Sequence, residues 1–307
     1  MASTPGGGIA ARRSVGGNGL LSGIKERVLN SFWLYTIAPY AIFLTFVLVP
    51  FLMGGYYAVT DWNGVSATMN FVGLENFVEM FRDDEGFIYS AWFTLRLTAA
   101  SVIIVNLIGL AYAVMFHRTT RWSSVLRVVL VLPNVIGGII LGFVWQFIYS
   151  QALPAFGGIL RSIQWLGDGE TAFWAVLIVF VWQQAGYVML IYIASMNSID
   201  EQLFESAEMD GASPFRQFVS VTLPLIVPAF TVSIFIVLAY SFKIFGLVFA
   251  LTGGGPYGST ESLAINIYRE AFLYGNYGLG SAKAVVFFVI VAVMSYLQVR
   301  FTQKREV

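Results

Sequence analysis

Six long apolar segments alternate with polar stretches along the chain. They cover residues 33–59, 91–116, 125–149, 172–195, 225–251 and 281–302. A helix rises about 1.5 Å per residue, so each segment is long enough to cross a hydrocarbon core of about 30 Å. The pattern predicts an all-α membrane protein with six transmembrane helices.

The residues before the first apolar segment follow a different pattern. Residues 1–32 are rich in Gly and Ser and show no apolar periodicity, which predicts a flexible tail. The first apolar run begins only near Phe32 and is about as long as a membrane span, too long for the apolar core of a signal peptide. We therefore expect residues 33–307 to form one membrane domain.

Composition agrees with this pattern and excludes several classes of function. The 307 residues are 58% hydrophobic and only 11% charged, whereas soluble domains average about 25% charged residues. Net charge is zero, and no basic cluster with interleaved aromatic residues indicates nucleic-acid binding. There is no cysteine and a single histidine, so we expect neither a catalytic thiolate nor a metal site.

The distribution of Lys and Arg predicts the orientation of the spans. If the N-terminus is inside the cell, the inner segments hold nine of these residues, and the outer loops hold three, namely Arg82, Arg161 and Arg269. Arg127 and Arg300 lie at the inner ends of their spans and add to the same side. The positive-inside rule then places both termini, and the loop between the fourth and fifth spans, in the cytoplasm.

That loop, residues 198–228, is the longest charged stretch between two apolar segments. Its apolar positions recur at helical spacing on either side of Asp210-Gly211, which predicts two short amphipathic helices joined at a sharp turn. Gly211 can adopt the positive φ that such a turn needs. Ser213-Pro214 is a typical start for the second helix, with Ser as N-cap and Pro at the first helical position.

The motif residues of this loop resemble the E-A-A loop of ABC importer permeases. The matching residues are Glu205-Ser206-Ala207, Asp210-Gly211-Ala212 and Val221-Thr222-Leu223-Pro224, with Ser206 and Val221 in place of the usual alanine and isoleucine. The resemblance implies that Glu205, Ala207, Asp210, Gly211, Ala212 and Pro224 couple the chain to an ATPase subunit. The alternative is a helix pair on the membrane surface without a partner, but such helices usually carry basic polar faces, and this one is acidic.

Two further segments narrow the resemblance. Phe71-Val72-Gly73-Leu74-Glu75-Asn76-Phe77 resembles the F-V-G-L-x-N segment of carbohydrate permeases, although an amphipathic interfacial helix would have a similar pattern. Residues 251–256, Leu-Thr-Gly-Gly-Gly-Pro, lack the Gly-Lys-Ser/Thr of a phosphate-binding loop and predict a turn that closes a helix. This turn resembles that of the maltose-type permease that forms one half of a heterodimer. The chain therefore resembles carbohydrate ABC importer permeases of the maltose and glycerol-phosphate type.

Charges inside the predicted spans bear on the source of energy. The spans hold no Asp or Glu, which argues against a proton- or sodium-coupled carrier. They hold three bases, of which Arg96 and Lys283 are near enough to the outer surface to snorkel, whereas Lys243 is deeper. In the third span, Gly138 and Gly142 have the small-xxx-small spacing that allows close helix packing.

Polar and aromatic residues in spans four and five are candidates for the substrate path. They are Gln183, Gln184 and Tyr187 in the fourth span and Tyr240 and Lys243 in the fifth. Aromatic rings and hydrogen-bonding side chains suit sugars, and the resemblance implies that these two helices build the transport site. The alternative is that the same side chains bond the helices to one another. Gly246 stands where relatives carry Asp, so Lys243 could instead meet an anionic group of the solute.

The resemblance implies a complex around this chain. We expect a second permease subunit, most simply in a heterodimer, a dimer of ATPase subunits that bind ATP and Mg²⁺, and an extracytoplasmic solute-binding protein. The chain itself would bind no cofactor, catalyse no reaction and lie in the cell membrane. The alternatives are a permease for a polyol, a glycerophosphodiester or an oligopeptide, and, in another class, an ion-coupled carrier or a membrane-embedded enzyme.

Overall fold

The computed structural model describes residues 35–82, 84–118 and 120–303, and these are almost entirely helical. Within them the only strand pairing is an isolated bridge between Thr60 and Phe71. The prediction of an all-α fold is thus confirmed, while the predicted tail at residues 1–32 lies outside the described residues. The chain divides into two units, one that ends at Met53 and one that begins at Gly54. The bundle described below belongs to the second.

The long apolar helices agree with six predicted spans, although several boundaries differ. Among the described residues, five single helical stretches are long and apolar enough to cross a membrane, and a bent helix pair makes a sixth if it is one span. The stretches are Tyr35–Tyr57 (with η1, Leu44–Leu48, and α2, Val49–Tyr57), α4 (Glu85–Phe116), Gly138–Ala155 (α6, Gly138–Phe147; η2, Ile148–Ala152; α7, Leu153–Ala155), α9 (Gly169–Met196) and α16 (Tyr277–Gln303). The bent pair comprises Pro214–Leu225 (α11, Pro214–Gln217; η3, Phe218–Thr222; α12, Leu223–Leu225) and α13 (Val227–Phe242).

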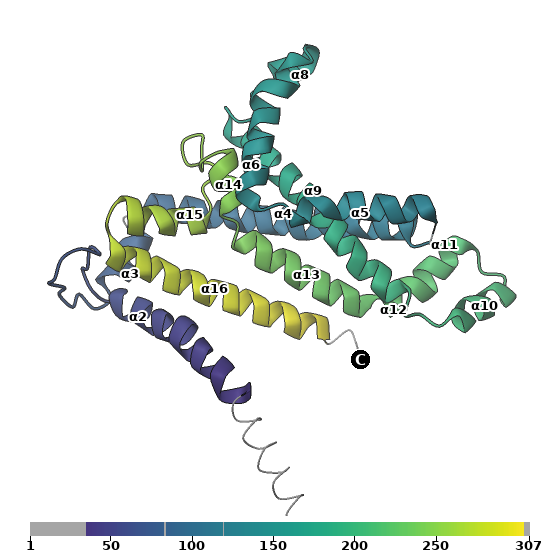
Figure 1. Ribbon diagram of the computed structural model, residues 1–307, viewed down its shortest axis with the longest axis horizontal. Coiled ribbons are helices and arrows are strands. Elements are labelled where there is room, and N and C mark those ends of the chain that lie inside the picture. The colour runs from purple at the N-terminus through teal and green to yellow at the C-terminus, as the bar shows by residue number, and fades with distance from the viewer. Residues whose placement is uncertain (1–34, 83, 119, 304–307) are drawn as a thin grey trace, which may run out of the picture. The chain divides into compact units, whose positions relative to one another are not determined.

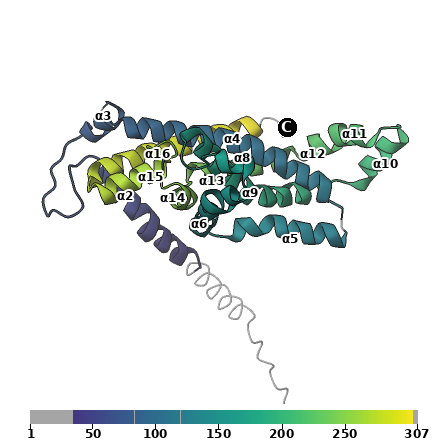
Figure 2. The same ribbon diagram turned by 90° about the horizontal axis from the view of Figure 1, so that it is seen from above.

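Helices α4, α9, α13 and α16 run alongside one another and form the body of the bundle (Figures 1 and 2). Helix α9 lies deepest, and about two-thirds of the residues in its most apolar 18-residue stretch are buried within the chain. The hydroxyl of Tyr192 in α9 donates to Asn106 Oδ1 of α4 at 2.6 Å and lies 2.9 Å from Ser233 Oγ of α13. Because buried polar groups need partners, this triad fixes the register of three helices at one point.

The third span does not run from residue 125 to 149 as predicted. Helix α5 (Arg121–Val135) ends at Ile136, whose backbone is extended, and α6 starts afresh at Gly138. The sequence carries a local signal for this break in Pro133, Asn134 and Gly137, but the apolar residues on both sides led to the prediction of one continuous span. In Figure 1 the segment from α6 to α8 (Gly158–Ser162) rises away from the bundle, while α5 lies along it.

The fifth span is also broken, and not continuous over residues 225–251. The chain bends by 65° between Leu225 and Val227, where Pro224 and Pro228 occupy first-turn positions of successive helices. Helix α13 then ends at Phe242, and a separate short helix, α14 (Gly246–Leu251), follows.

Helix α14 packs against α6 through glycines, as the small-residue spacing of the third span predicts. A Cβ atom on Gly142 would lie 2.6 Å from Ala250 Cβ and 2.8 Å from the Leu247 carbonyl oxygen. A Cβ on Gly138 would lie 3.2 Å from the Leu247 nitrogen. Any larger side chain at Gly142 would therefore push these two backbones apart.

The segment at residues 71–77 has a structural role in the loop between Tyr57 and α4. It begins α3 (Glu75–Arg82), and the Asn76 amide, 7% exposed, donates to the carbonyl oxygens of Ala58 and Thr60 at 2.9 Å each. Gly73 precedes the helix with φ +64. The asparagine therefore joins the chain that leaves the first span to the helix that leads to the second.

Candidate coupling and transport sites

Residues Asp200–Thr222 form a projecting helical hairpin, which we call the knob. Helix α10 (Glu201–Met209) is capped by Asp200, whose Oδ1 accepts from the Gln202 amide at 3.0 Å. Helix α11 starts at Pro214, and Ser213 Oγ accepts from the Arg216 amide. The two predicted helices, the Ser N-cap and the Pro at the helix start are confirmed. Figures 1 and 2 show the knob at one end of the bundle.

The turn of the knob is a Schellman motif, which gives the motif residues a physical role. The Ala212 amide donates to the Ala207 carbonyl and the Gly211 amide to the Glu208 carbonyl, both at 2.9 Å. Gly211 has φ +74, and a Cβ there would meet no atom within 4 Å. The need for glycine thus comes from the backbone conformation. Ala207 and Ala212 are both half-buried where such motifs bring two small apolar side chains together.

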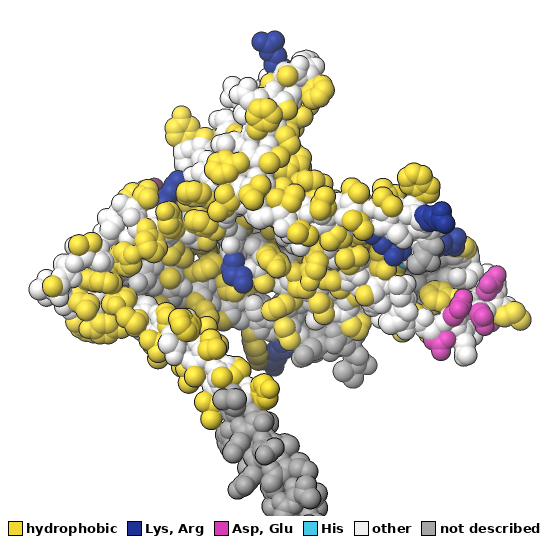
Figure 3. Space-filling model, viewed as in Figure 1, with side chains coloured by type: hydrophobic (Ala, Val, Ile, Leu, Met, Phe, Trp, Pro, Cys, Tyr) yellow, Lys and Arg dark blue, Asp and Glu magenta, His cyan; other side chains and the backbone are white. Residues whose placement is uncertain are grey.

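The knob exposes both charge and apolar surface. Glu201, Glu205, Glu208 and Asp210 are all exposed and form no ion pair with any described residue. Figure 3 shows the acidic side chains of one face gathered over α10, with basic side chains near the start of α5. Met209 is 89% exposed and Phe215 is 77% exposed. Neither residue could be identified as exposed from the sequence, because an apolar residue in a short amphipathic helix is normally assigned to its buried face.

A cavity of about 500 Å³ lies where the knob joins the bundle. The ends of α4 and α9 line one side of it, and α10 to η3 line the other. His117, Arg118 and Glu201 contribute its polar lining. The knob is therefore attached at its base without being packed against the bundle along its length.

The two glutamines predicted for the substrate path are engaged in bonds between helices. Gln183 is 9% exposed, and its Nε2 donates to the Ile136 carbonyl at 3.2 Å. Gln184 is 3% exposed, and its Oε1 accepts from Asn134 Nδ2 at 3.2 Å. Ile136 is the point at which α5 breaks, so the glutamines satisfy backbone and side-chain groups at that break. This arrangement favours interhelical bonding for both glutamines.

Unlike the glutamines, Tyr187, Tyr240 and Lys243 show no side-chain hydrogen bond or ion pair with any described residue. Tyr187 is half-buried on α9, Tyr240 is 55% exposed on α13, and Lys243 is exposed. No hydrogen bond or ring contact within residues 54–300 joins Tyr187 to the other two. Lys243 is the C-cap of α13, where a cation is favoured by the negative end of the helix dipole. Its place in the sequence therefore has a local explanation in addition to any role toward solute.

Lys283 does not snorkel, contrary to the prediction. It is 0% exposed, and its ammonium group contacts Glu270 Oε2 at 2.6 Å and also pairs with Asp84. Glu270 Oε1 accepts from Asn276 Nδ2 at 2.7 Å, and Asp84 Oδ1 accepts from the Phe87 amide at 2.9 Å. The sequence could not show this pairing, because both acids lie outside the apolar segment that holds the lysine.

Arg96 likewise has a partner instead of reaching only for water. Its Nη2 lies 2.5 Å from Glu170 Oε1, and its guanidinium carbon lies 4.0 Å from the centre of the Phe173 ring. Glu170 also accepts from Trp174 Nε1 at 3.0 Å. Glu85 and Glu170, the acids within the apolar helices, both lie in first turns. They therefore sit at helix ends, and mid-depth positions in the described spans hold no carboxylate.

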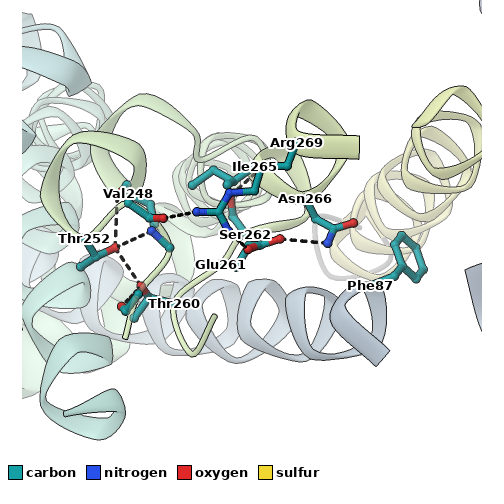
Figure 4. Close-up of polar contacts among 12 residues, drawn as sticks. Phe87, Val248, Thr252, Thr260, Glu261, Ser262, Ile265, Asn266 and Arg269 are labelled. Carbon is teal, nitrogen blue, oxygen red and sulfur yellow. Dashed lines mark hydrogen bonds and ion pairs between the residues drawn. The ribbon is translucent and has the colours of Figure 1, made fainter. Parts of the chain in front are cut away.

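The glycine-rich turn after α14 is held by side chains from the next helix, α15 (Leu263–Tyr268), and its surroundings (Figure 4). Arg269 donates to the Gly253 carbonyl at 2.5 Å and pairs with Glu261. Thr260 Oγ1 lies 2.8 Å from Thr252 Oγ1. Asn266 Nδ2 donates to Glu261 Oε1 at 2.9 Å. The expectation of a structural turn fits this network of side-chain bonds.

Comparison with protein families gives a match to the binding-protein-dependent transport system inner membrane component over residues 105–307. The chain is 43% identical over 280 residues to the probable starch degradation products transport system permease protein AmyD of Thermoanaerobacterium thermosulfurigenes, covering 90% of this chain and 95% of that protein. It is 31% identical over 285 residues to the trehalose/maltose transport system permease protein MalF of Thermococcus litoralis, covering 89% and 94%.

A solved structure shares the fold. A chain in the crystal structure of a bacterial ABC transporter involved in the import of the acidic polysaccharide alginate superposes with a TM-score of 0.75. The two chains are 22% identical, and the match covers 92% of this chain and 98% of that chain. The overall arrangement of the helices is therefore one already seen in a crystal structure.

Proposed function

The chain belongs to the family of binding-protein-dependent transport system inner membrane components, and we propose that it is a permease subunit of an ABC importer for a sugar or sugar-like solute. In this role it lies in the cell membrane as a multi-pass protein and catalyses no reaction itself. The sugar class is supported by relatives whose names include starch degradation products, multiple sugars, and trehalose and maltose.

The observation that carries the coupling role is the exposed surface of the knob. A hairpin held by caps and a Schellman turn is rigid within itself, whereas Glu201, Glu205, Glu208 and Asp210 pair with no base among the described residues and the side chains of Met209 and Phe215 are exposed. Such a surface suits a complementary cleft on another subunit. We assign that subunit as the ATPase, with Glu205 and Gly211 at the centre of the contact and ATP and Mg²⁺ bound by the ATPase dimer.

The mechanism that follows is alternating access driven from the cytoplasm. ATP binding closes the ATPase dimer, the docked knob moves as a rigid element, and the helices behind it open the cavity outward. Solute then enters from an extracytoplasmic binding protein. This requires the knob and both termini in the cytoplasm, in line with the excess of Lys and Arg in the segments assigned to that side.

The path for solute would lie between this chain and a second permease subunit, which we expect to be a different chain. Tyr187, Tyr240 and Lys243 are the candidate contacts, because their polar groups bond to no other described residue. If Lys243 instead meets an anionic solute group, Lys243→Met and Lys243→Gln should impair uptake of anionic solutes and spare neutral ones. A permease for a polyol or glycerophosphodiester is the nearest alternative function.

Site-specific crosslinking tests the proposed coupling directly, because the chain contains no native cysteine. Ala207→Cys and Ser213→Cys lie on either side of the turn, and a bifunctional reagent in energised vesicles should capture a nucleotide-hydrolysing protein from both. The same reagent on Ser162→Cys, which is exposed on α8, should not. An ion-coupled carrier would give no such product and would purify without an ATPase, and that outcome would overturn the proposal.

A further inference from the structure

A second cavity lies at the end of the bundle opposite the knob, at the first turns of α4 and α9. Its volume is about 430 Å³, and the loop at residues 257–261 closes one side. This is within the range of about 300–1,000 Å³ that small-molecule sites occupy. We refer to it as the outer pocket, because the proposed orientation places it on the side from which solute arrives.

Exposed aromatic side chains surround the outer pocket. Tyr89 and Trp92 on α4 are each 66% exposed, and the Tyr257 side chain on the loop is fully exposed. The floor is apolar and buried, with Phe93 and Phe173 in an edge-to-face contact whose ring centres are 6.1 Å apart. Flat aromatic faces beside a closed floor suit the C–H faces of a sugar ring.

The polar groups of the outer pocket are placed to bind hydroxyls. Arg96 and Glu170 form an ion pair on one wall and remain partly exposed, at 39% and 56% of their side chains. Ser90 also lines the pocket, yet it is 1% exposed and its Oγ has no hydrogen-bond partner within the described part of the chain. A buried hydroxyl without a partner is uncommon and is satisfied if a ligand supplies one.

The loop beside the pocket is held in an uncommon backbone conformation. Tyr257 has φ +51, the only non-glycine residue with positive φ among those described. A bulky residue is rarely found there, because its Cβ approaches the following carbonyl. Strain of this kind is retained mainly where it places a side chain for function. Here it holds an exposed aromatic ring at the rim of the pocket.

The charges of the pocket select the class of ligand. The positive charge of Arg96 is balanced by Glu170, and the acid Glu261 is balanced by Arg269. The pocket therefore offers donors and acceptors with no excess of either sign. An anionic solute would need an unpaired cation, which the lining does not contain.

An interfacial aromatic belt also places Trp and Tyr at a membrane surface. It accounts for exposed rings but requires neither a cavity, an ion pair beside them nor a buried hydroxyl that lacks a partner.

We propose that the outer pocket is an entry site for a neutral oligosaccharide, whose rings stack on Trp92 and Tyr89 and whose hydroxyls bind Ser90 and the Arg96–Glu170 pair. This inference rests on the proposed sugar-import function and adds a site to it.

Protection of a single cysteine tests the site in the assembled importer. The complete complex, reconstituted in nanodiscs without binding protein, would carry Ser259→Cys, an exposed pocket residue, or Ser162→Cys as the matched control outside it. A neutral, water-soluble maleimide is the label, and the probes are maltotriose, N,N′-diacetylchitobiose, trehalose and glycerol 3-phosphate. At least one neutral sugar should slow labelling of Ser259→Cys about fivefold, with no change at Ser162→Cys.

Variants of Trp92 show whether the sugar protects Ser259→Cys by binding in the outer pocket or by a nonspecific effect on labelling. Trp92→Ala in the Ser259→Cys background should raise the half-protecting sugar concentration about tenfold, whereas Trp92→Phe should keep it within about twofold. Trp122→Ala, which removes another highly exposed tryptophan on α5, should have no effect. Equal protection of both cysteines, protection by glycerol 3-phosphate, or a Ser259→Cys that no reagent reaches would overturn the proposal.

Uptake by the same complex, with binding protein and ATP, distinguishes failure of this site from failure of the proposed function. Uptake of a neutral sugar that gives no protection contradicts the outer pocket alone. If a complex that hydrolyses ATP takes up none of the three sugars, the sugar-import function is wrong, and the entry site fails with it.

Discussion

Charged side chains gather at both ends of the bundle, but they are used differently at each end. At the end opposite the knob, which we call the outer end after its place in the proposed orientation, Lys283 binds Glu270 and Asp84, and Arg269 binds Glu261. On the knob, the acids of α10 bind no base within the described residues. Charges that are satisfied within a chain stabilise it, whereas a cluster of one sign left exposed is available to a partner. The comparison therefore separates structural charges from those of an interface.

The largest effect should come from breaking the buried cluster at the outer end. Lys283→Met would leave Glu270 and Asp84 without their cation, and removing one partner of a buried ion pair costs about 3–5 kcal/mol of unfolding free energy. Thermal unfolding of the purified chain in detergent measures this. Lys243→Met is the matched control, because Lys243 is exposed at the end of α13 and surface changes usually cost less than about 0.5 kcal/mol. Equal losses of unfolding free energy for the two variants would mean that the buried cluster does not stabilise the fold.

A change in the knob should have the opposite effect: uptake should fall, whereas the unfolding free energy of the chain should change little. Gly211→Val forces a β-branched residue into a conformation at φ +74, which costs roughly 1–2 kcal/mol locally. The turn should distort, and ATP-driven uptake should fall severalfold or more while the complex still assembles. Uptake per purified complex in proteoliposomes measures the coupling.

The outer end offers a close control for this substitution. Gly275, between η4 (Arg269–Leu273) and α16, also has φ +74, and a Cβ there meets no atom within 4 Å. Gly275→Val should therefore cause similar local strain without uncoupling the complex. If both valine variants import at the normal rate, the turn at Gly211 has no coupling role.

An exposed ion pair tests whether burial or pairing makes the outer charges stabilising. Arg96 and Glu170 are paired but exposed, so their interaction should contribute only about 0.2–1 kcal/mol. A double-mutant cycle with Arg96→Gln and Glu170→Gln, followed by thermal unfolding, measures the coupling energy. A value near that of the Lys283 cluster would show that burial is not what distinguishes the two.

The same contrast explains what the sequence could and could not predict. The knob was predicted nearly in full, because Asp210-Gly211 and Ser213-Pro214 are local signals for a turn and a helix start. The breaks at Ile136 and Lys243 were not, because the groups that stabilise them come from elsewhere in the chain. Gln183, for example, donates to Ile136 from 47 residues away.

Candidate site residues follow the same rule. Exposed motif residues such as Glu205 could be named from the sequence, because their motif resembles the E-A-A loop of a known family and its local spacing defines their place in the helix. The partners of Lys283 and Arg96 could not, because Glu270, Asp84 and Glu170 lie in loops or first turns that meet these bases only in the folded bundle. The aromatic rim of the outer pocket was missed for the same reason. Tyr89, Trp92 and Tyr257 are separated in sequence and brought together by the fold.

The smallest predicted effect concerns an exposed acid that, unlike the acids of α10, is hydrogen-bonded within its own loop. Asp61 Oδ2 accepts from Asn70 Nδ2 at 2.8 Å and Oδ1 from the Asn70 amide at 2.7 Å. The side-chain bond first, and then the backbone bond, hold the pKa of the Asp61 carboxyl below its ordinary range. Asn70→Leu should raise this pKa, as measured by NMR of ¹³C-labelled aspartate.

The sign of the linked stability change follows from the direction of the shift. A carboxyl whose pKa is lowered by folding favours the folded state above its unfolded pKa, and this contribution is lost as the pH falls through the folded pKa. Asn70→Leu should therefore destabilise the loop at neutral pH and have no such effect in strong acid. Asn63→Leu is the control, because Asn63 Oδ1 accepts from the amides of Val65 and Ser66 in the same loop and Asn63 is not among the residues that lower the pKa of Asp61. An unchanged Asp61 pKa in Asn70→Leu would show that the Asn70 side chain does not stabilise the Asp61 carboxylate. The contrast between the two ends of the bundle would then rest on the buried Lys283 cluster alone.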